Sequence, residues 1–328
     1  MLPNHTVQFE KYSSIALRGD VLTREECREV LSTPNSEILG LLHAAYAVRK
    51  AFAGNTVQVQ MLTNAKSGSC IEDCHYCSQS SISTASIDRH GILPEDKLVE
   101  DAHRASDSKA VRYCIVTSGR GPLDHEVDVI GKAVRRIKQN LPLQVCCSLG
   151  LLTKHQAYRL KDAGVDRINH NLNTSERYHS DICGTHTFQD RIDTINNAKK
   201  SGLEICSGGI IGMGEGDEDI IDLALALRDI GPDSIPINFL HPIEGTPLTN
   251  CNTLTPQRCL KVLCLFRFLH PRKEIRAAGG REYNFRSLQP LALFAADSLF
   301  VDGYLTTPGQ PKNEAWKMIE DLGFTIAE

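Results

Sequence analysis

The sequence lacks long hydrophobic runs and any strong excess of charge of one sign. No stretch of about 18 consecutive apolar residues occurs among its 328 residues, so no membrane-spanning helix is predicted. The opening residues, MLPNHTVQFEKYSS, contain no continuous apolar segment of the kind that directs secretion. The net charge of −4 and the pI near 6.3 give no electrostatic reason to expect nucleic acid or an anionic membrane as a partner.

Cysteine is the residue whose abundance needs an explanation. The 12 cysteines fall well short of the roughly 8–10% that is typical of a small disulfide-rich scaffold. They are nevertheless numerous for a chain without a predicted secretory signal, and we expect a reducing, cytoplasmic location. In that compartment clustered cysteines indicate metal or redox chemistry more often than disulfide bonds.

Short apolar runs alternate with amphipathic stretches along most of the chain, which predicts strands followed by helices. Eight such strands over about 250 residues favour an α/β fold, a (β/α)8 TIM-type barrel, with a doubly wound open sheet as the rival. The predicted strands begin near Val57, Val111, Leu143, Asp166, Leu203, Ser234, Glu274 and Ser298. The predicted helices span 94–105, 125–139, 154–162, 189–200, 217–228, 256–269 and 285–295.

The first part of the chain is predicted to form a helical extension ahead of the barrel. Thr23 and Glu26 have the spacing of a capping box, and a further helix is predicted over 36–53. Thr153 and Thr255 are expected to be N-caps of barrel helices. No linker-like stretch divides the remainder, so we expect an N-terminal helical extension at 1–54 and one barrel domain at 55–328.

The strongest motif is the run Cys70-Ile-Glu-Asp-Cys74-His-Tyr-Cys77, which follows the first predicted strand. Three thiolates at this spacing can surround one small cluster, and thiolates are the usual ligands of iron–sulfur clusters. A four-iron cluster held by three cysteines keeps one iron open for a small molecule. Structural zinc is the alternative, with His75 or His90 as the fourth ligand, although zinc sites more often use two Cys-x-x-Cys pairs.

Strand periodicity predicts a second polar site inside the barrel. Alternate residues of a strand face the same side, and several predicted strands have one apolar face and one face that carries Cys, Arg, Asn or Ser. These polar faces hold Arg112 with Cys114, Gln144 with Cys146 and Ser148, Glu204 with Cys206, Ser234 with Asn238, and Glu274 with Arg276. Buried polar groups need partners, so the pattern favours a ligand-filled barrel.

The spacing of the cysteine motif resembles that of the radical S-adenosylmethionine (SAM) superfamily, and the sequence around the motif is similar to that of the biotin synthase family. The resemblance covers roughly residues 15–328. It rests on KSGSCIEDCHYCSQS (66–80), NHNLNTS (169–175), CSGGIIGMGE (206–215), SIPINFL (234–240), GTPL (245–248), GGRE (279–282) and LTTP (305–308).

The resemblance implies the last step of biotin biosynthesis, a sulfur insertion that converts dethiobiotin to biotin. In that family a 4Fe–4S cluster binds SAM and cleaves it to a 5′-deoxyadenosyl radical, which abstracts hydrogen from the substrate. An auxiliary iron–sulfur cluster inside the barrel donates the sulfur. The family also leads us to expect a flavodoxin- or ferredoxin-type electron donor and a homodimer.

The resemblance assigns roles to individual residues. The three cysteines of the motif, Cys70, Cys74 and Cys77, match the 4Fe–4S ligands. The residues that match the auxiliary-cluster ligands are Cys114, Cys146, Cys206 and Arg276. The residues that match SAM contacts are Thr117, Ser118, Gly119, Asn171, Asn173 and Arg191. The residues that match dethiobiotin contacts are Lys66, Asn171, Asn238, Thr306 and Thr307.

Two of these assignments compete with other interpretations of the residues. Arginine is normally fully protonated, so the residues alone would favour a salt bridge for Arg276 over a metal bond. Cys146 is adjacent to Cys147, and only the family pattern of Cys, any residue, Ser or Thr, Leu, Gly selects Cys146 as the ligand.

Three departures from the family pattern leave the auxiliary cluster and the exact activity open. Cys114 is followed by Ile-Val-Thr-Ser-Gly-Arg-Gly, Asn173 stands where relatives have aspartate, and Cys147 is an additional thiol. We expect a 2Fe–2S auxiliary cluster, with a larger cluster as the alternative. Another radical SAM enzyme such as a metallocofactor maturase, or a non-catalytic iron–sulfur protein, are the other functions considered. The cysteines without an expected ligand role are Cys27, Cys147, Cys183, Cys251, Cys259 and Cys264.

Overall fold

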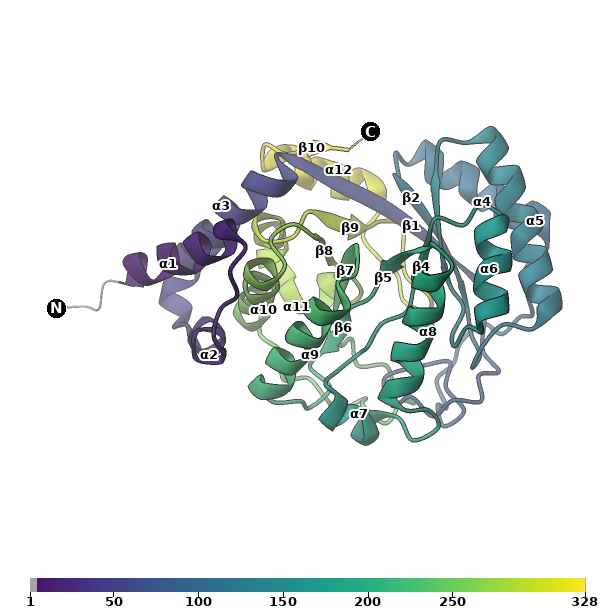
Figure 1. The fold of residues 1–328 in the computed structure, drawn as a ribbon, viewed down its shortest axis with the longest axis horizontal. Coiled ribbons are helices and arrows are strands. Elements are labelled where there is room, and N and C mark those ends of the chain that lie inside the picture. The colour runs from purple at the N-terminus through teal and green to yellow at the C-terminus, as the bar shows by residue number, and fades with distance from the viewer. Residues whose placement is uncertain (1–4, 328) are drawn as a thin grey trace.

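A closed ring of parallel strands forms the centre of the computed structural model, which describes residues 5–327 (Figure 1). Strand β1 pairs with both β2 and β9, and this pairing closes the ring. The barrel strands are β1 Thr56–Lys66, β2 Arg112–Thr117, β3 Gln144–Ser148, β4 Arg167–Asn169, β5 Glu204–Cys206, β6 Gly209–Ile211, β7 Ser234–Phe239, β8 Glu274–Ala277 and β9 Ser298–Phe300. The (β/α)8 prediction is confirmed, and the doubly wound open sheet is wrong.

Helices follow the strands and cover the outside of the barrel. The barrel helices are α4 Glu95–Asp107, α5 Asp124–Asn140, α6 Lys154–Asp162, α7 Glu176–Ile182, α8 Phe188–Lys200, α9 Asp217–Ile230, α10 Pro256–Leu269, α11 Arg281–Phe285 and α12 Lys312–Asp321. Thr153 and Thr255 cap α6 and α10 through their side chains, as predicted. None of the helices described between residues 5 and 327 is both long enough and apolar enough to cross a membrane.

The fifth predicted strand is interrupted and becomes two short strands, β5 and β6. Between them, Gly208 lies so close to β7 that a Cβ atom would be 1.9 Å from the Pro236 carbonyl oxygen. Only glycine allows this approach of two backbones. Both short strands still pair with β7, through Cys206 opposite Ser234 and Gly209 opposite Ile237, so together they occupy one position in the ring.

The helix predicted over 285–295 is wrong in type. The segment is a 3₁₀ helix, η2 Arg286–Phe294, that follows α11 and contains Pro290. Proline lacks the N–H group of an α-helical bond and clashes with the preceding turn, which accounts for the difference. The prediction also gave no range for α1 His5–Arg18, α7, α11, α12 or the terminal strand β10 Thr325–Ile326, which pairs with the start of β1.

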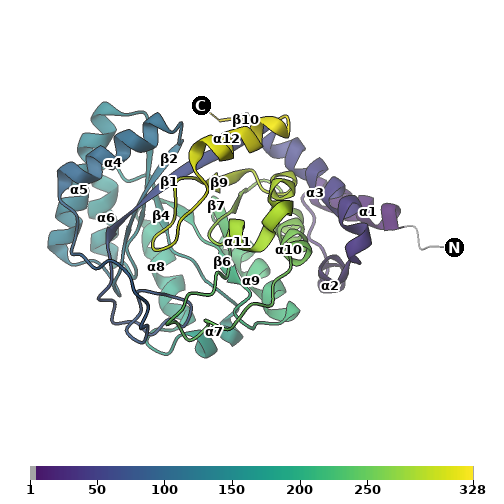
Figure 2. The same cartoon turned by 180° about the vertical axis from the view of Figure 1, so that it is seen from behind.

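Helices α1 His5–Arg18, α2 Arg24–Ser32 and α3 Ile38–Ala53, with the short η1 Asn35–Glu37, lie at one side of the barrel near α10 (Figures 1 and 2). Thr23 and Glu26 form the predicted capping box at the start of α2. Arg49 of α3 is fully buried and donates to the carbonyl oxygens of Gly54 at 2.7 Å, Thr56 at 2.8 Å and Ala296 at 3.0 Å. Its guanidinium group therefore ties α3 to the starts of β1 and β9.

The strands of the barrel separate two regions of buried side chains. Tyr113 and Ile115 of β2 face outward and belong to the large core between the strands and the helices. Cys114 lies between them in sequence and faces inward, where it packs with Ala278 and Phe300. The interior thus holds polar and sulfur-bearing side chains, as strand periodicity predicted.

We predict that Arg49→Met lowers the free energy of unfolding by about 3 kcal/mol, because three buried carbonyl oxygens lose a charged donor. Urea denaturation followed by circular dichroism measures the change. Arg136→Met is the matched control, since that exposed side chain forms surface ion pairs with Glu95 and Asp96 and its loss should change stability by less than about 1 kcal/mol. Equal losses in both variants would contradict this role of Arg49.

Candidate active site

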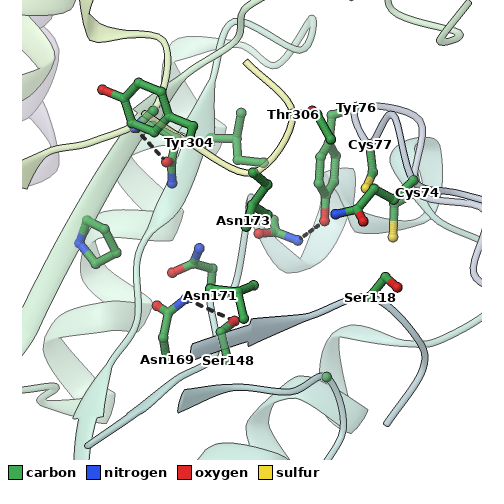
Figure 3. A pocket seen from close by; sticks show the side chains of 18 of the residues that line it. Cys74, Tyr76, Cys77, Ser118, Ser148, Asn169, Asn171, Asn173, Tyr304 and Thr306 are labelled. Atoms are coloured by element: carbon green, nitrogen blue, oxygen red, sulfur yellow. Dashed lines mark hydrogen bonds between the residues drawn. The ribbon is translucent and has the colours of Figure 1, made fainter. Parts of the chain in front are cut away.

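A cavity of about 410 Å³ opens among the carboxyl ends of the strands (Figure 3). Its wall includes Ser118 after β2, Ser148 at the end of β3 and Asn169 at the end of β4. Asn238 of β7 and Gly279 after β8 complete the ring of strand ends. This end of a parallel barrel is where βα loops assemble active sites, because side chains from different strands converge there.

The three cysteines of the motif lie together at the mouth of this cavity. Cys70, Cys74 and Cys77 all line it, from the long loop between β1 and α4. The backbone N–H of Cys77 donates to the carbonyl oxygen of Cys74 at 3.1 Å, which forms a turn between these two residues. Burial raises the pKa of the Cys77 thiol to about 11. A bound metal would replace the thiol protons, so this donor set fits an iron–sulfur cluster.

The histidines proposed for a zinc site do not join these cysteines. Neither His75 nor His90 belongs to the described wall of the cavity. The backbone N–H of His75 donates to the Ile182 carbonyl oxygen at 3.0 Å, and His90 Nδ1 lies 2.8 Å from the carbonyl oxygen of Gly91. The arrangement therefore favours a three-thiol site over the zinc alternative.

A chain of charged and polar groups holds the cysteine loop against the opposite wall. Glu72 of the loop accepts a hydrogen bond from Arg120 at 2.9 Å and contacts His186 Nδ1. On the other side of the ring, His186 Nε2 lies 2.6 Å from Nη2 of Arg191. Burial opposes the negative charge of Glu72, but hydrogen bonds from Thr185, His186 and Arg120 hold the pKa of its carboxyl below the usual range. The loop and Arg191 are thus positioned by one network.

Three asparagines line the wall after β4 and offer polar atoms to a ligand (Figure 3). The Asn169 amide donates to Ser148 Oγ at 3.2 Å, and Asn171 Oδ1 accepts from the Gly208 backbone N–H at 3.0 Å. The Asn173 amide lies 2.5 Å from the Tyr76 hydroxyl, and its backbone has a φ of +74°. Asparagine tolerates this left-handed conformation better than most residues.

Several polar atoms of this wall are buried without a partner. Within the described residues these atoms include Asn169 Oδ1, His170 Nε2 and Arg191 Nε. Burial, together with the charges of Arg191 and His186, lowers the pKa of His170 well below its usual value, so the ring is neutral. Unpaired buried polar groups are rare in folded proteins because they cost free energy. All three residues line the cavity, so this wall keeps unused hydrogen-bonding capacity next to the space where a polar ligand would bind.

The second predicted set of ligands meets in the barrel interior, where Cys114 and Arg276 also line the cavity. Cys114 and Cys146 are paired residues of β2 and β3, and Cys206 lies on β5. Arg276 Nη1 donates to the Cys206 sulfur at 3.7 Å. A hydrogen bond with Cys114 and burial raise the pKa of the Cys146 thiol well above its usual value, and burial raises that of Cys206. Neutral buried thiols around one space are a suitable donor set for a second metal cluster.

Cys146 and Cys147 face opposite sides of the barrel wall. Cys146 packs inward with Cys114, whereas Cys147 lies in the core between the strands and the helices. Successive residues of a strand alternate between faces, so Cys147 points away from the space shared by Cys114, Cys146 and Cys206.

Beneath these thiols, three arginines surround one carboxylate. Glu274 accepts from Arg276 at 2.5 Å, from Arg167 at 3.0 Å and from Arg112 at 3.2 Å. All four side chains are buried. Burial alone would raise the pKa of Glu274, but the three guanidinium charges hold it far below its usual range. The three arginines carry more positive charge than Glu274 neutralises, and this net positive charge would also favour negative charge on the neighbouring sulfur atoms.

The structure places most of the predicted contact residues on the cavity wall. Lining residues include Cys114, Ser118, Gly119, Asn171, Asn173, Arg191, Asn238, Arg276, Thr306 and Thr307. Asn238 donates to the Gly209 carbonyl oxygen at 3.1 Å and accepts from the Gly279 N–H at 2.9 Å. The Thr306 hydroxyl lies 2.8 Å from that of Ser78, beside the cysteine loop.

Four predicted site residues are absent from the described cavity wall. Cys146 and Cys206 lie deeper, in the interior layer described above. Thr117 is buried at the end of β2, and the Lys66 ammonium group forms a salt bridge with Glu126 at 2.7 Å. The Lys66 ammonium group is therefore paired with Glu126, and Lys66 is not among the residues described as lining the cavity.

Sequence reasoning missed Tyr76, Tyr304, Glu72, His186 and Cys183. Tyr76 and Tyr304 line the cavity, and Cys183 lies 3.7 Å from Cys74, sulfur to sulfur. Hydrogen bonds, first with Cys74 and then with His186, lower the pKa of the Cys183 thiol. The polar run Cys-Gly-Thr-His at 183–186 was the available signal, but nothing in the sequence brings it next to the cysteine motif.

Comparisons with family models and with curated proteins point to the same family. Residues 66–227 match the Radical SAM superfamily, and residues 236–325 match the Biotin and Thiamin Synthesis associated domain. A biotin synthase of Bacillus subtilis subsp. natto is 53% identical over 319 residues, which cover 97% of this chain and 95% of that protein. A biotin synthase of Geobacillus thermodenitrificans is 52% identical over 310 residues, or 94% of this chain and 93% of that protein.

Solved structures with low sequence identity share the fold. Methylornithine synthase superposes with a TM-score of 0.82 at 19% identity and covers 97% of both chains. The FeFe-hydrogenase maturase HydG from Carboxydothermus hydrogenoformans gives a TM-score of 0.80 at 16% identity, over 99% of this chain and 80% of that chain. At such identities the likeness to a maturase concerns the barrel fold alone.

We predict that Glu274→Gln lowers the free energy of unfolding by about 3–5 kcal/mol, because three buried guanidinium groups lose their shared negative partner. Urea denaturation of the cluster-free protein measures this change. Glu244→Gln, on an exposed side chain, is the matched control and should have little effect. A fully stable Glu274→Gln variant would show that the carboxylate charge is not required in the barrel interior.

Proposed function

The chain belongs to the biotin synthase family of radical SAM enzymes, and from that premise we propose how one cavity carries out the insertion of sulfur into dethiobiotin. The observation that carries the proposal is the presence of two separate groups of thiols. Cys70, Cys74 and Cys77 lie at the mouth, and Cys114 belongs to the group in the interior. Asparagine, arginine and threonine side chains line the space toward the mouth, where substrate and SAM would meet.

Cys70, Cys74 and Cys77 would hold the 4Fe–4S cluster. When bound, this cluster supplies the electron that cleaves SAM to methionine and the 5′-deoxyadenosyl radical. Arg191 would bind the SAM carboxylate, and its buried Nε without a partner among the described groups supports this role. Ser118 and Gly119, at the end of β2, would bind the SAM amino group, with Thr117 holding the strand end behind them.

Asn171 and Asn173 would bind the ribose of SAM from the wall after β4. The neutral amide of Asn173 would offer both a donor and an acceptor to the ribose hydroxyls, where relatives use a carboxylate. The neighbouring hydroxyl of Tyr76, 2.5 Å from the Asn173 amide, would restrict its rotation. Asn171 would also contact dethiobiotin.

Cys114, Cys146, Cys206 and Arg276 would hold the auxiliary cluster, which supplies sulfur to the substrate. We propose a 2Fe–2S cluster at this position. The three buried thiols and the proximity of Arg276 to Cys206 support the ligand set. The guanidinium groups of Arg112 and Arg167 would stabilise the thiolate form of these ligands, since both lower the pKa of Cys146 against its burial.

Dethiobiotin would lie between the two clusters. The Asn238 amide keeps one N–H and one carbonyl lone pair beyond its two protein hydrogen bonds, which suits a cyclic urea. Thr306 and Thr307, at the edge of the cavity, would bind the carboxylate of the valeryl tail. Lys66 would add a positive charge near this carboxylate if its salt bridge to Glu126 opens.

The wider setting follows the family. We propose that the enzyme works in the cytoplasm as a homodimer and receives electrons from a flavodoxin- or ferredoxin-type protein. Residues 1–54 would form the helical extension, and residues 55–328 the radical SAM barrel. The 12 free cysteines support a reducing location.

An anaerobic single-turnover reaction tests the proposed function. Reconstituted protein with SAM, a reductant and dethiobiotin should form 5′-deoxyadenosine and biotin, both measured by mass spectrometry. Deoxyadenosine without biotin would refute the proposed use of the interior thiols and leave the radical SAM assignment intact. Absence of both products would refute the proposed 4Fe–4S site.

The two adjacent cysteines of β3 provide a matched pair of variants. Cys146→Ser should abolish biotin formation and preserve SAM cleavage, because the mouth cysteines are unchanged. Cys147→Ser should retain biotin formation, since its side chain packs toward the helices. Optical and Mössbauer spectra of each variant report which cluster is lost. The opposite result in the two variants would reverse the assignment of the ligand.

A further inference from the structure

A second group of metal-binding side chains shares only one residue with the cysteine motif. Cys74, Cys183 and His186 are buried, and their ligand atoms all lie within 4.8 Å of one another. Cys183 and His186 come from the segment between α7 and α8, far along the chain from Cys74. The proposed reaction gives Cys183 no role.

The distance between the two sulfur atoms suits a single ion. Cys74 Sγ and Cys183 Sγ are 3.7 Å apart. Two thiolates bound to one tetrahedral zinc ion, at about 2.3 Å each, are separated by about 3.8 Å. His186 Nδ1 is 3.2 Å from Cys183 Sγ, and an ion-bound pair would be about 3.6 Å apart. The third pair, Cys74 Sγ and the His186 nitrogen, lies within 4.8 Å, so the three ligand atoms surround one small space.

The segment that carries Cys183 is anchored to the cysteine loop. Asp73 accepts hydrogen bonds from the backbone N–H groups of Gly184 at 2.9 Å and Thr185 at 3.1 Å. The Cys183 thiol is 3.2 Å from the same Asp73 oxygen, which places a carboxylate beside Cys183. The ligands are therefore held together before any ion arrives, and less ordering is needed on binding.

The other tautomer of the His186 ring would allow metal binding. Because Nε2 accepts from Arg191, the ring proton lies on Nδ1 in the metal-free protein, where it faces Glu72. An ion on Nδ1 would therefore replace the contact between His186 and Glu72, which keeps its hydrogen bonds from Arg120 and Thr185. An ion on Nδ1 would require the proton on Nε2, and Arg191 would need another acceptor. With its amide turned to satisfy both groups, Asn173 Oδ1 lies 3.0 Å from Arg191 Nη2 and provides that acceptor.

We propose that Cys74, Cys183 and His186 bind one divalent ion, Zn²⁺ or Fe²⁺, in the cluster-free protein. Binding forms two metal–sulfur bonds and one metal–nitrogen bond, and the displaced thiol protons pass to solvent. Since Cys74 is shared, this ion and the three-thiol cluster exclude each other, a consequence that rests on the proposed function. The binding of the ion itself does not depend on that function.

Anaerobic titration of the full-length, cluster-free protein with Co²⁺ tests this site. The Cys70→Ser/Cys77→Ser variant removes two cluster ligands and keeps all three proposed ones, so it should bind Co²⁺ with thiolate-to-cobalt charge-transfer absorption. Adding Cys183→Ser to this variant should weaken the binding of one Co²⁺ ion per chain at least about 10-fold. Substitution of a residue that only supports a metal ligand already weakens metal binding by about that factor, so loss of a ligand should have at least this effect. His186→Gln in the same background should also weaken it.

The matched control is Cys251→Ser in the same background, a free, half-buried cysteine outside the group. It should leave Co²⁺ binding unchanged. The interior cysteines are present in every variant, so any Co²⁺ that they bind is the same in all of them. Binding that is unaffected by Cys183→Ser would overturn the proposal, and binding unaffected by His186→Gln would remove the histidine from the ligand set. Circular dichroism confirms the fold of each variant. The Co²⁺ titration tests the ion site and the single-turnover reaction tests the proposed function. Failure of one proposal can therefore be distinguished from failure of the other.

Discussion

The burial of three guanidinium groups around one carboxylate is the constraint on which the barrel interior depends. Glu274 accepts from Arg112 of β2, Arg167 of β4 and Arg276 of its own strand, β8. Charges removed from water must be paired with good geometry, or the structure loses several kcal/mol. This requirement fixes the facing strands relative to one another. Arg167 also reaches Glu204, but that carboxylate is half-exposed, so the buried layer below the interior thiols keeps a positive excess.

The same arrangement explains how one barrel can provide two environments for sulfur. The interior thiols are buried beside positive charge, which favours their thiolate form and so suits the auxiliary cluster proposed there. The cysteines at the mouth lie on a loop, and that loop is held by Glu72 through Arg120 and His186. His186 in turn contacts Arg191, the residue proposed to bind the SAM carboxylate. The cysteine loop and Arg191 are therefore linked through one imidazole ring.

Much of the barrel could be predicted from local pattern. Apolar runs and end signals located eight strand positions, and Thr23, Thr153 and Thr255 cap helices as expected. The errors occurred where a single residue overrides the pattern. Pro290 makes the segment after α11 a 3₁₀ helix, and the close approach of Gly208 to β7 divides one expected strand into two. Both effects depend on steric contacts that periodicity does not describe.

The sequence by itself determined the spacing of Cys70, Cys74 and Cys77 and the alternation that turns polar residues inward, because both depend only on neighbours along the chain. Tertiary structure alone decided which distant groups meet. It gave Lys66 the partner Glu126 and brought Cys183 within 3.7 Å of a cysteine 109 positions earlier. Such contacts are set by how the loops fold back over the strand ends, and this path is not encoded in any local period.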